Sequence, residues 1–360
     1  MAQRRKTRTV SVGTVKIGSG YPISVQSMTK TDTADIDATV CQIRQLEEKG
    51  CELVRVAVKD ASSARAISSI KQSTRIPIIA DIHFDHVLAL EAVARGADKI
   101  RINPGNIRKP SEIDAIINSA SEKDIPIRIG VNSGSLPRRA DGQRGTMPEA
   151  LLNHLERFRK RRFNNIVISL KSSSVEETVE AYRKIARECD YPFHVGVTAA
   201  GLPCEGIVKS SIGIGALLLD GIGDTIRVSL TGSPDEEVAT ARRILASAGV
   251  RHFGPEIISC PTCGRCRVDI AAVAEELGKA LERVEKSLVV AVMGCEVNGP
   301  GEARDADIGI AFGANNKGAI FQKGKVTRTV RADEAVKVLV EMINKDVGAG
   351  LVPARDAGRK

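Results

Sequence analysis

Aromatic residues are scarce in this sequence, which has no tryptophan, three tyrosines and seven phenylalanines in 360 residues. Proteins that bind single-stranded nucleic acid stack bases on aromatic side chains, so the composition argues against that function. No apolar run is long enough to span a membrane. The basic, polar residues 1–9 have no apolar core of the kind that secretory signals carry. We therefore expect a cytoplasmic protein with no membrane or nucleic-acid partner.

Charge is unbalanced, with a formal net charge of +9. Such an excess favours anionic partners, among them phosphorylated metabolites, although scattered surface lysines and arginines explain it equally well. Eight cysteines in a cytoplasmic chain are not expected to form a disulfide framework. Four of them stand alone and are expected to be small buried apolar residues: Cys41, Cys51, Cys189 and Cys204.

Short β-branched runs alternate with amphipathic segments over the first two thirds of the chain. This alternation predicts βαβ units and a parallel sheet, and eight units in about 250 residues match a TIM (β/α)₈ barrel. A doubly wound sheet is the alternative, but no G-x-G-x-x-G follows the first run. The expected strands are Ile23–Gln26, Glu52–Val58, Ile76–Ile82, Lys99–Asn103, Pro126–Val131, Asn165–Leu170, Pro192–Thr198 and Thr225–Leu230.

The pattern changes after the helix expected over Asp235–Ala248. A short apolar run leads into a cysteine-rich loop, and helices are expected over Val268–Lys286 and Ala332–Lys345. Short strands are expected between them. The sequence therefore predicts two domains, a barrel over residues 1–250 and a smaller α/β domain over residues 251–360.

Four of the expected barrel strands carry one arginine between β-branched residues. Because side chains alternate across a strand, the aliphatic neighbours pack on the helices and each arginine points into the barrel. Four guanidinium groups would repel one another unless an anion joined them, and their planar forks suit phosphate. Pairing with carboxylates such as Asp81 is the alternative. The four residues are Arg55, Arg101, Arg128 and Arg227.

Polar residues follow several of these strands. Barrel active sites lie at the carboxyl ends of the strands, so these residues are candidates for substrate binding. They are Asp81, Asn103, Asn132, Lys171 and Ser229. Lys209 precedes a Gly- and Ser-rich stretch, which can open a helix and bind phosphate through its free N–H groups.

Half of the cysteines belong to one constellation, Cys260-Pro-Thr-Cys263-Gly-Arg-Cys266 followed by Cys295. Thiolates at this spacing can hold either zinc or an iron–sulfur cluster. The turn after Cys295 would bring Glu302 back towards it as an oxygen ligand, and oxygen on a cluster iron is labile enough to yield to a substrate.

These segments together resemble the (E)-4-hydroxy-3-methylbut-2-enyl diphosphate synthases of the non-mevalonate isoprenoid pathway. The similarity extends over about residues 9–345. The segments that carry it are Val25–Thr33, Ala80–Asp85, Arg101–Asn106, Arg128–Ser135, Gly221–Leu230, Cys260–Cys263 and Gly294–Ala303.

The resemblance implies a two-electron reduction of 2-C-methyl-D-erythritol 2,4-cyclodiphosphate, in which the ring opens, a hydroxyl is lost and an allylic diphosphate forms. It implies a [4Fe–4S] cluster on Cys260, Cys263, Cys295 and Glu302, and substrate binding by the barrel arginines with Asp81, Asn103 and Asn132. It also implies a homodimer, in which the cluster domain of one subunit closes over the barrel of its partner, and flavodoxin or ferredoxin as electron donor.

Two positions depart from the family pattern. Ala199 stands where the family has a glutamate near the reacting carbon, so the chain is either an impaired variant or uses another proton source, with Glu205 as a candidate. Cys266 is an additional cysteine that could replace Glu302 as a ligand. A zinc-containing, phosphate-binding barrel without redox activity is the leading alternative function, and a nucleic-acid-binding protein with a zinc ribbon is a remoter one.

Overall fold

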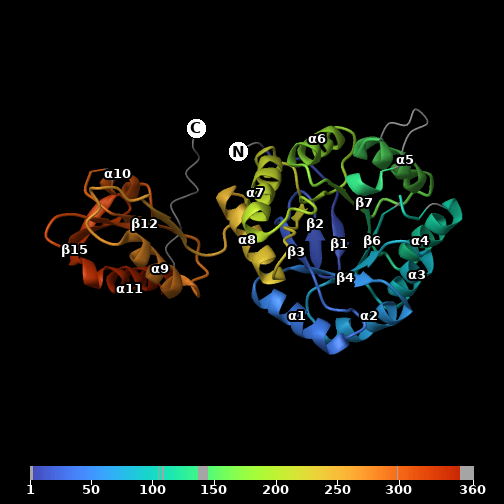
Figure 1. Ribbon diagram of the computed structural model, residues 1–360, viewed down its shortest axis with the longest axis horizontal. Helices are drawn as coiled ribbons and strands as arrows, with labels where there is room; N and C mark the ends of the chain where they lie inside the picture. Colours follow the sequence, from blue (N-terminus) through green and yellow to red (C-terminus); the bar gives the residue numbers. More distant parts are fainter. Residues whose placement is uncertain (1–2, 104, 108, 137–144, 298, 349–360) are drawn as a thin grey trace. The chain divides into compact units, whose positions relative to one another are not determined.

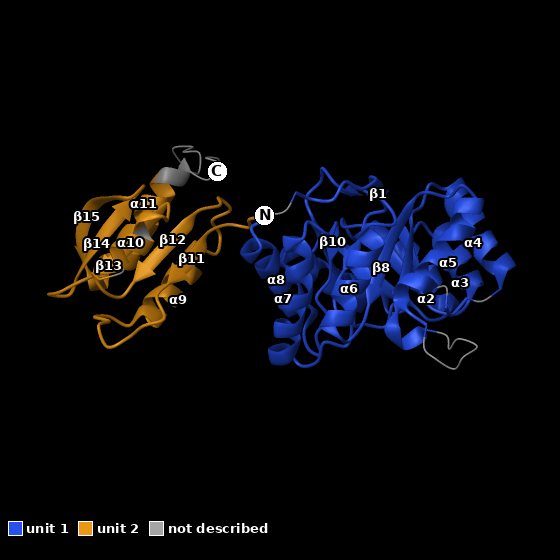
Figure 2. Ribbon diagram, turned by 90° about the horizontal axis from the view of Figure 1, so that it is seen from above, with its two compact units in different colours: residues 1–251 blue, residues 252–360 orange. Residues whose placement is uncertain are grey.

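The structure is a computed structural model that describes residues 3–103, 105–107, 109–136, 145–297 and 299–348. Pro104 and Asn298, which belong to two of the segments that carry the family resemblance, lie outside the described residues. The chain divides into two compact units, residues 1–251 and residues 252–360 (Figure 2). Each unit is described by itself below.

The first unit is built on eight parallel strands in the order β8-β7-β6-β5-β4-β3-β10-β9. A parallel bridge between Ile168 and Phe193 joins the two ends of this order, so the predicted TIM barrel is confirmed. All eight expected runs contain a strand. The bounds are β3 Ser24–Met28, β4 Leu53–Val58, β5 Ile78–Ile82, β6 Lys99–Ile102, β7 Ile127–Asn132, β8 Ile166–Lys171, β9 His194–Val195 and β10 Thr225–Ile226.

Helices surround the strands on the outside (Figure 1). Several begin at a side chain that accepts a backbone hydrogen bond, as at Asp35, Asp60 and Ser174, and this satisfies amide groups that a helix start leaves without partners. The bounds are α1 Ile36–Glu48, α2 Ala61–Ser73, α3 His86–Ala94, α4 Pro110–Glu122, α5 Met147–Lys160, α6 Val175–Ala186, α7 Pro203–Leu219 and α8 Pro234–Ser247, with a short 3₁₀ turn η1 at Ser133–Ser135.

An N-terminal hairpin covers the amino ends of the barrel strands. Its strands are β1 Val10–Val12 and β2 Val15–Ile17, and they pack on Leu53, Ile79 and Val167 of the barrel. The preceding residues hold the later part of the barrel: Arg4 pairs with Asp224 at 3.1 Å, and the Arg5 guanidinium lies 3.9 Å from the ring of Phe193. This hairpin was not among the elements expected from the sequence.

The second unit is a five-stranded mixed sheet with helices. Its strands lie in the order β11-β12-β13-β14-β15, and β11, β12 and β13 are parallel. The core includes Leu277, Val290, Ile310 and Leu339. The bounds are β11 Glu256–Ser259, α9 Ile270–Leu281, β12 Val289–Met293, α10 Gly299–Arg304, β13 Ile308–Phe312, β14 Lys317–Gln322, β15 Lys325–Arg331, η2 Ala332–Glu334 and α11 Ala335–Gly348.

Two expectations are wrong. Of the four isolated cysteines only Cys51 is buried, while Cys41 and Cys204 are exposed, because helices α1 and α7 present those positions to solvent. The helix expected to open near Ser211 begins at Pro203, so Lys209 lies within α7, exposed, and cannot mark a phosphate-binding helix start. Among the described residues, no helix is long and apolar enough to cross a membrane.

Candidate active site

The four strand arginines occupy the interior of the barrel. Arg128 and Arg101 are 1% and 4% exposed, and the side chains of Arg55 and Arg227 are 12% exposed. Arg101 donates to Asp81 at 3.0 Å, and Arg55 Nε lies 3.5 Å from the other oxygen of the same carboxylate. The single negative charge of Asp81 is therefore shared by two arginines and cannot neutralise both positive charges.

The other partners of these arginines are weak acceptors or distant. Arg55 donates to the thioether sulfur of Met28 at 2.9 and 3.1 Å, and such a sulfur accepts weakly. Within the described part of the chain, Arg128 donates to the amide oxygen of Gln26 alone, at 3.3 Å. Arg227 lies 3.4 Å from Glu237, a carboxylate that also accepts from the backbone of Leu230. The guanidinium groups thus retain unused capacity for an anion.

Further basic groups lie among the arginines. Lys99 is fully buried, and burial, followed by the charges of Arg128 and Arg55, lowers its pKa well below the usual value. Burial and then Arg128 do the same to the pKa of Lys171. Burial also lowers the pKa of Arg55 to about 9, although Asp81 opposes this. Lys99 was not among the residues expected at the site, yet its spacing of two from Arg101 places both side chains on one face of β6.

The surroundings favour the charged form of Asp81, whereas they disfavour the charged forms of the buried lysines. Burial disfavours its charged form, but Arg55, a hydrogen bond from His83, and Arg101 outweigh this and hold its pKa well below the usual range. Among the described groups in the interior, basic side chains outnumber the carboxylates of Asp81 and Glu237. Several donor atoms there have no hydrogen-bond partner among the described residues: Gln26 Nε2, Lys99 Nζ, Arg101 Nε, Arg128 Nε and Arg227 Nε. A polyanion is the ligand that satisfies this excess.

Two glycines leave room for these cations. A Cβ atom on Gly130 would lie 2.8 Å from Arg101 Nε, and one on Gly196 would lie 2.9 Å from Lys171 Nζ. Both contacts are closer than real Cβ atoms tolerate. The inward positions of β7 and of the segment after β9 are therefore left without side chains, and the long basic side chains of β6 and β8 fill the space.

Replacement of Gly130 by alanine is expected to displace the Arg101 guanidinium and to weaken the binding of inorganic pyrophosphate about tenfold, the equivalent of losing roughly 1.4 kcal/mol. Isothermal titration calorimetry on the full chain measures this effect. Gly134 has open space where its Cβ would lie, so Gly134→Ala is the matched control and should bind normally. Equal binding by both variants would mean that Arg101 does not contact the anion.

The remaining predicted barrel residues lie at or beyond the carboxyl ends of strands. Asn103, after β6, donates to Ser135 Oγ at 2.9 Å, and that hydroxyl donates to the backbone carbonyl of Asn132 at the end of β7. Ser229 is half-buried after β10. Glu205 lies in the first turn of α7 and is exposed. The structure thus links Asn103 and Asn132 through Ser135, a residue that the sequence analysis did not select.

Ala199 has a left-handed backbone conformation, with φ of +49°. Residues other than glycine rarely adopt this conformation, and such strain often occurs where a backbone is held for function. The residue lies four positions beyond the end of β9, on the segment that begins with Gly196. The position itself offers no side-chain acid.

The cysteine constellation lies at the carboxyl ends of β11 and β12, which are adjacent parallel strands. Cys260 follows β11, and its sulfur accepts a hydrogen bond from the Gly294 amide at 3.2 Å. A Cβ atom on Gly294 would lie 3.3 Å from the same sulfur and would collide with the sulfur of Cys266. Because Gly294 has no side chain, the sulfur atoms of Cys260 and Cys266 can both lie beside it.

The other proposed ligands belong to the same unit, but their side chains do not converge on one point. Cys263 is exposed in the loop after β11, Cys295 is half-buried after β12, and Glu302 lies in α10. Among the described residues, no three cysteine, histidine or carboxylate groups lie close enough to hold one metal ion. The donor chemistry nevertheless fits an iron–sulfur cluster, because thiolates dominate it and a backbone N–H already donates to one sulfur.

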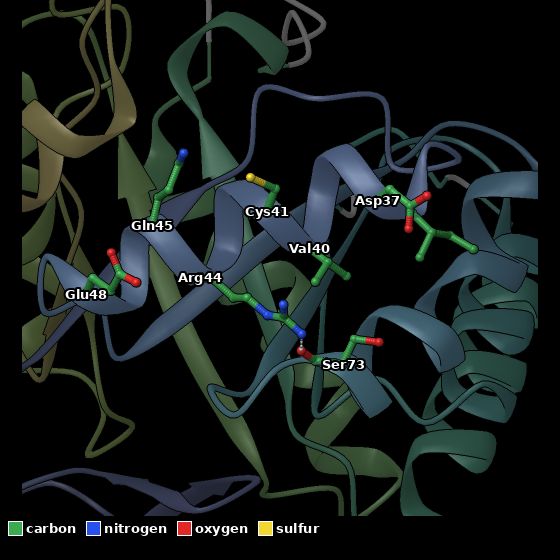
Figure 3. Close-up of a pocket in the computed structure, with 8 residues that line it drawn as sticks. Asp37, Val40, Cys41, Arg44, Gln45, Glu48 and Ser73 are labelled. Carbon is green, nitrogen blue, oxygen red and sulfur yellow. Dashed lines mark hydrogen bonds between the residues drawn. The ribbon is translucent and has the colours of Figure 1, made fainter.

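A groove on the outside of the barrel contains none of the predicted site residues. Figure 3 shows it on α1 and the end of α2, with Val40 and Arg44 near Ser73. Arg44 donates to the backbone carbonyl of Ser73 at 3.1 Å. The groove is lined by helix residues, whereas the cationic groups face the barrel interior, so it is separate from the candidate site.

Comparison with known proteins identifies the family. Residues 7–242 match the GcpE TIM-barrel domain, and residues 256–345 match the GcpE protein C-terminal domain. The chain is 53% identical over 350 residues to the 4-hydroxy-3-methylbut-2-en-1-yl diphosphate synthase (flavodoxin) of Thermodesulfovibrio yellowstonii, covering 96% of this chain and 100% of that protein. It is 52% identical to the enzyme of the same name from Nitratidesulfovibrio vulgaris, covering 91% and 86% of the two chains. The chain therefore belongs to the GcpE family.

Proposed function

We propose that this protein is an oxidoreductase that reduces 2-C-methyl-D-erythritol 2,4-cyclodiphosphate to 4-hydroxy-3-methylbut-2-enyl diphosphate. The excess of buried basic groups inside the barrel is the observation that carries the proposal, since a diphosphate is the kind of ligand that balances it. The name shared by relatives about half identical to the chain supports the same reaction. The substrate-binding residues in this proposal are Arg55, Asp81, Arg101, Asn103, Arg128, Asn132, Lys171, Arg227 and Ser229.

The second unit would hold a [4Fe–4S] cluster on Cys260, Cys263, Cys295 and Glu302. Bound there, the cluster supplies low-potential electrons one at a time. The role of the protein is to hold the thiolates, with the Gly294 amide donating to Cys260, and to offer Glu302 as the one oxygen ligand. In the barrel, the arginines orient the diphosphate and stabilise the charge that forms when the ring opens.

The partners belong to the same proposal. Relatives carry flavodoxin in their name, and we infer flavodoxin, or a ferredoxin of similar potential, as the electron donor. We also infer a cytoplasmic homodimer. Mixing a variant defective in the barrel with one defective in the cluster ligands tests for shared sites, because activity returns only where one subunit serves its partner.

Metal content after anaerobic purification is the first test of this function. Iron and sulfide at about four each per chain and a broad absorption near 400 nm fit the cluster. Consumption of the cyclodiphosphate with a strong reductant should follow. Zinc at about one per chain with no colour would fit a closed tetrahedral site and would overturn the redox assignment.

Replacement of Ala199 by glutamate is expected to raise turnover at least tenfold, because a carboxylic acid would then stand near the reacting carbon; positioned acids contribute about 10²- to 10⁴-fold to catalysis. The backbone already has a positive φ there, so glutamate adds little strain beyond that of alanine. Steady-state turnover measures the change, with Ala199→Gln as the control that cannot donate a proton. Unchanged or lower turnover in the glutamate variant would contradict the prediction.

A further inference from the structure

We propose that the hairpin formed by β14 and β15, residues 317–331, is the surface on which an acidic flavodoxin docks to deliver electrons to this chain. The partner is a small electron carrier with carboxylates around its flavin. This assignment rests on the proposed function, which names the kind of donor but not the place where it binds. The hairpin lies at one edge of the sheet of the second unit (Figure 2).

Positive charge is concentrated on this hairpin. Residues 308–332 contain five basic residues and no aspartate or glutamate, and all five basic side chains are exposed. Arg331 pairs with Asp333 at 3.0 Å, whereas the other four form no ion pair within the described part of the chain. The five residues are Lys317, Lys323, Lys325, Arg328 and Arg331. The hairpin therefore presents four cations that no carboxylate neutralises.

Charges on an edge strand also have a structural use. β15 is the last strand in the order of the sheet, and charged side chains on such a strand keep other chains from pairing with it. Charges of either sign serve that purpose, so it does not explain why acidic residues are absent from the whole segment. A surface of one sign attracts a partner of the opposite sign and speeds their encounter.

Apolar contact area lies within the same surface. Val326 is 58% exposed and stands opposite Phe321, whose side chain packs with Met293 on the face of the sheet that α10 covers. Val297, two residues beyond the proposed ligand Cys295, is 63% exposed. A small apolar centre with a charged rim is the usual composition of a protein–protein contact.

The hairpin touches the helix that carries a proposed cluster ligand. A Cβ atom on Gly324, in the turn between β14 and β15, would lie 3.0 Å from Cγ of Arg304. Arg304 ends α10, two residues beyond Glu302. At the other end of this helix, a Cβ atom on Gly299 would lie 3.0 Å from the Cβ atom of Met293, the last residue of β12. Helix α10 therefore connects the turn of the hairpin with the strand that leads to the ligand loop.

The open end of the hairpin lies at the same edge of the sheet as the proposed thiolate ligands. β13 is parallel to β12, β14 is antiparallel to β13, and β15 is antiparallel to β14. Lys317 at the start of β14 and Arg331 at the end of β15 therefore lie opposite each other at the edge where β12 leads to Cys295. Neighbouring strands are about 4.8 Å apart, which places these two residues roughly 10–14 Å from β12. A carrier docked there stands within a few strand widths of the ligand loop.

The electron balance needs two encounters with the carrier. At each encounter the reduced flavodoxin loses one electron and the bound cluster gains it, so two encounters supply the two electrons of the proposed reduction. The oxidised carrier must leave between them. Exposed charges suit this requirement, because they raise the rate of association without making the complex long-lived.

The central test reverses two charges of the hairpin in the full chain loaded with its cluster, as Lys325→Glu with Arg328→Glu. We expect kcat/KM for reduced flavodoxin to fall about 10- to 10²-fold, through KM for flavodoxin, because the steering charges now repel the carrier. Turnover with methyl viologen reduced by dithionite should stay within about twofold, because so small a donor needs no docking surface. Added salt should slow the flavodoxin reaction of the unmodified protein more than that of the variant.

Lys337→Glu with Lys345→Glu is the matched control. Both side chains are exposed on α11, outside the hairpin, and the change in net charge is the same. This control should retain normal kinetics with flavodoxin. Equal loss in the two variants, an unchanged KM for flavodoxin in the hairpin variant, or an equal loss with viologen would each overturn the inference.

A binding measurement tests the surface without turnover. Titration calorimetry of the full chain with oxidised flavodoxin at low salt should show binding that the hairpin variant loses and the control variant keeps. Equal binding by all three proteins would overturn the inference. If the loaded, unmodified protein fails to reduce the cyclodiphosphate even with viologen, the proposed function fails, while this titration still decides whether the hairpin binds an acidic flavodoxin.

Discussion

Replacing Arg128 by methionine is expected to weaken the binding of inorganic pyrophosphate about 10²- to 10³-fold, since truncating one partner of a buried charge pair costs roughly 2–5 kcal/mol. The same change should raise the melting temperature of the ligand-free chain. Arg128 is 1% exposed, its one hydrogen bond among the described residues is to Gln26, and burial followed by Arg55 and Arg101 lowers its pKa well below the usual value. Binding and stability therefore respond in opposite directions.

The expected stabilisation follows from the cost of a buried charge without a counterion. Replacing buried ionic groups by apolar side chains of similar volume is often stabilising by about 1–4 kcal/mol, which corresponds to a few degrees in a domain of this size. Scanning calorimetry and titration calorimetry on one preparation measure both effects. Arg183→Met is the matched control, because Arg183 is half-exposed on α6 and pairs with Asp220 at 2.7 Å. A loss of both stability and binding in Arg128→Met would contradict this account.

Replacing Cys295 by serine is expected to remove almost all iron, sulfide and visible absorption from the purified protein. A cluster with one thiolate missing loses a ligand that the remaining donors cannot supply. Pyrophosphate binding should remain unchanged, because residues 1–251 form a compact unit of their own. Metal analysis, absorption spectroscopy and titration calorimetry check these two outcomes on the same sample.

Cys266 provides the internal comparison for that experiment. Its sulfur lies beside Gly294, close to the first predicted ligand, and donates to the carbonyl of Val268 at 3.1 Å. Cys266→Ser should keep the cluster, and Cys41→Ser, on the exposed face of α1, should be indistinguishable from the unmodified protein. A cluster that survives in Cys295→Ser but is lost in Cys266→Ser would show that the wrong cysteine was assigned.

The barrel could be predicted because each strand carries its own hydrophobic signal. Val54 and Val56 flank Arg55 and pack outward, so the alternation fixed both the strand and the direction of the arginine. The lengths of β9 and β10 could not be read in the same way. Their β-branched runs continue past Val195 and Ile226, but the regular ladder of strand pairing ends there and is followed by isolated backbone bonds, such as Arg227 N–H to the Val195 carbonyl at 3.0 Å. Pairing depends on the partner strand rather than on the run itself.

Other features needed the tertiary structure. Glu237 reads in the sequence as an acidic residue in the first turn of α8, where it suits the helix dipole, yet it is buried against Arg227 and Leu230. The hairpin at residues 10–17 did leave a signal, since Val10, Val12, Val15 and Ile17 alternate around a turn in which Gly13 has φ of +55°. The contact of Lys171 Nζ with His194 Nε2, at 3.2 Å, left no such signal, because it depends on how β8 and β9 lie against each other.

The contacts of the N-terminal segment also determine when the barrel can close while the chain is being synthesised. Arg4 bonds to Asp224, and β3 pairs with β10, so contacts that close the barrel join residues about two hundred positions apart. Contacts this distant in sequence form late, and a chain emerging from the ribosome must expose its first strands until residue 226 is available. The cysteines at 260–295 follow that point, so cofactor assembly would act on a chain whose barrel segment has already been translated.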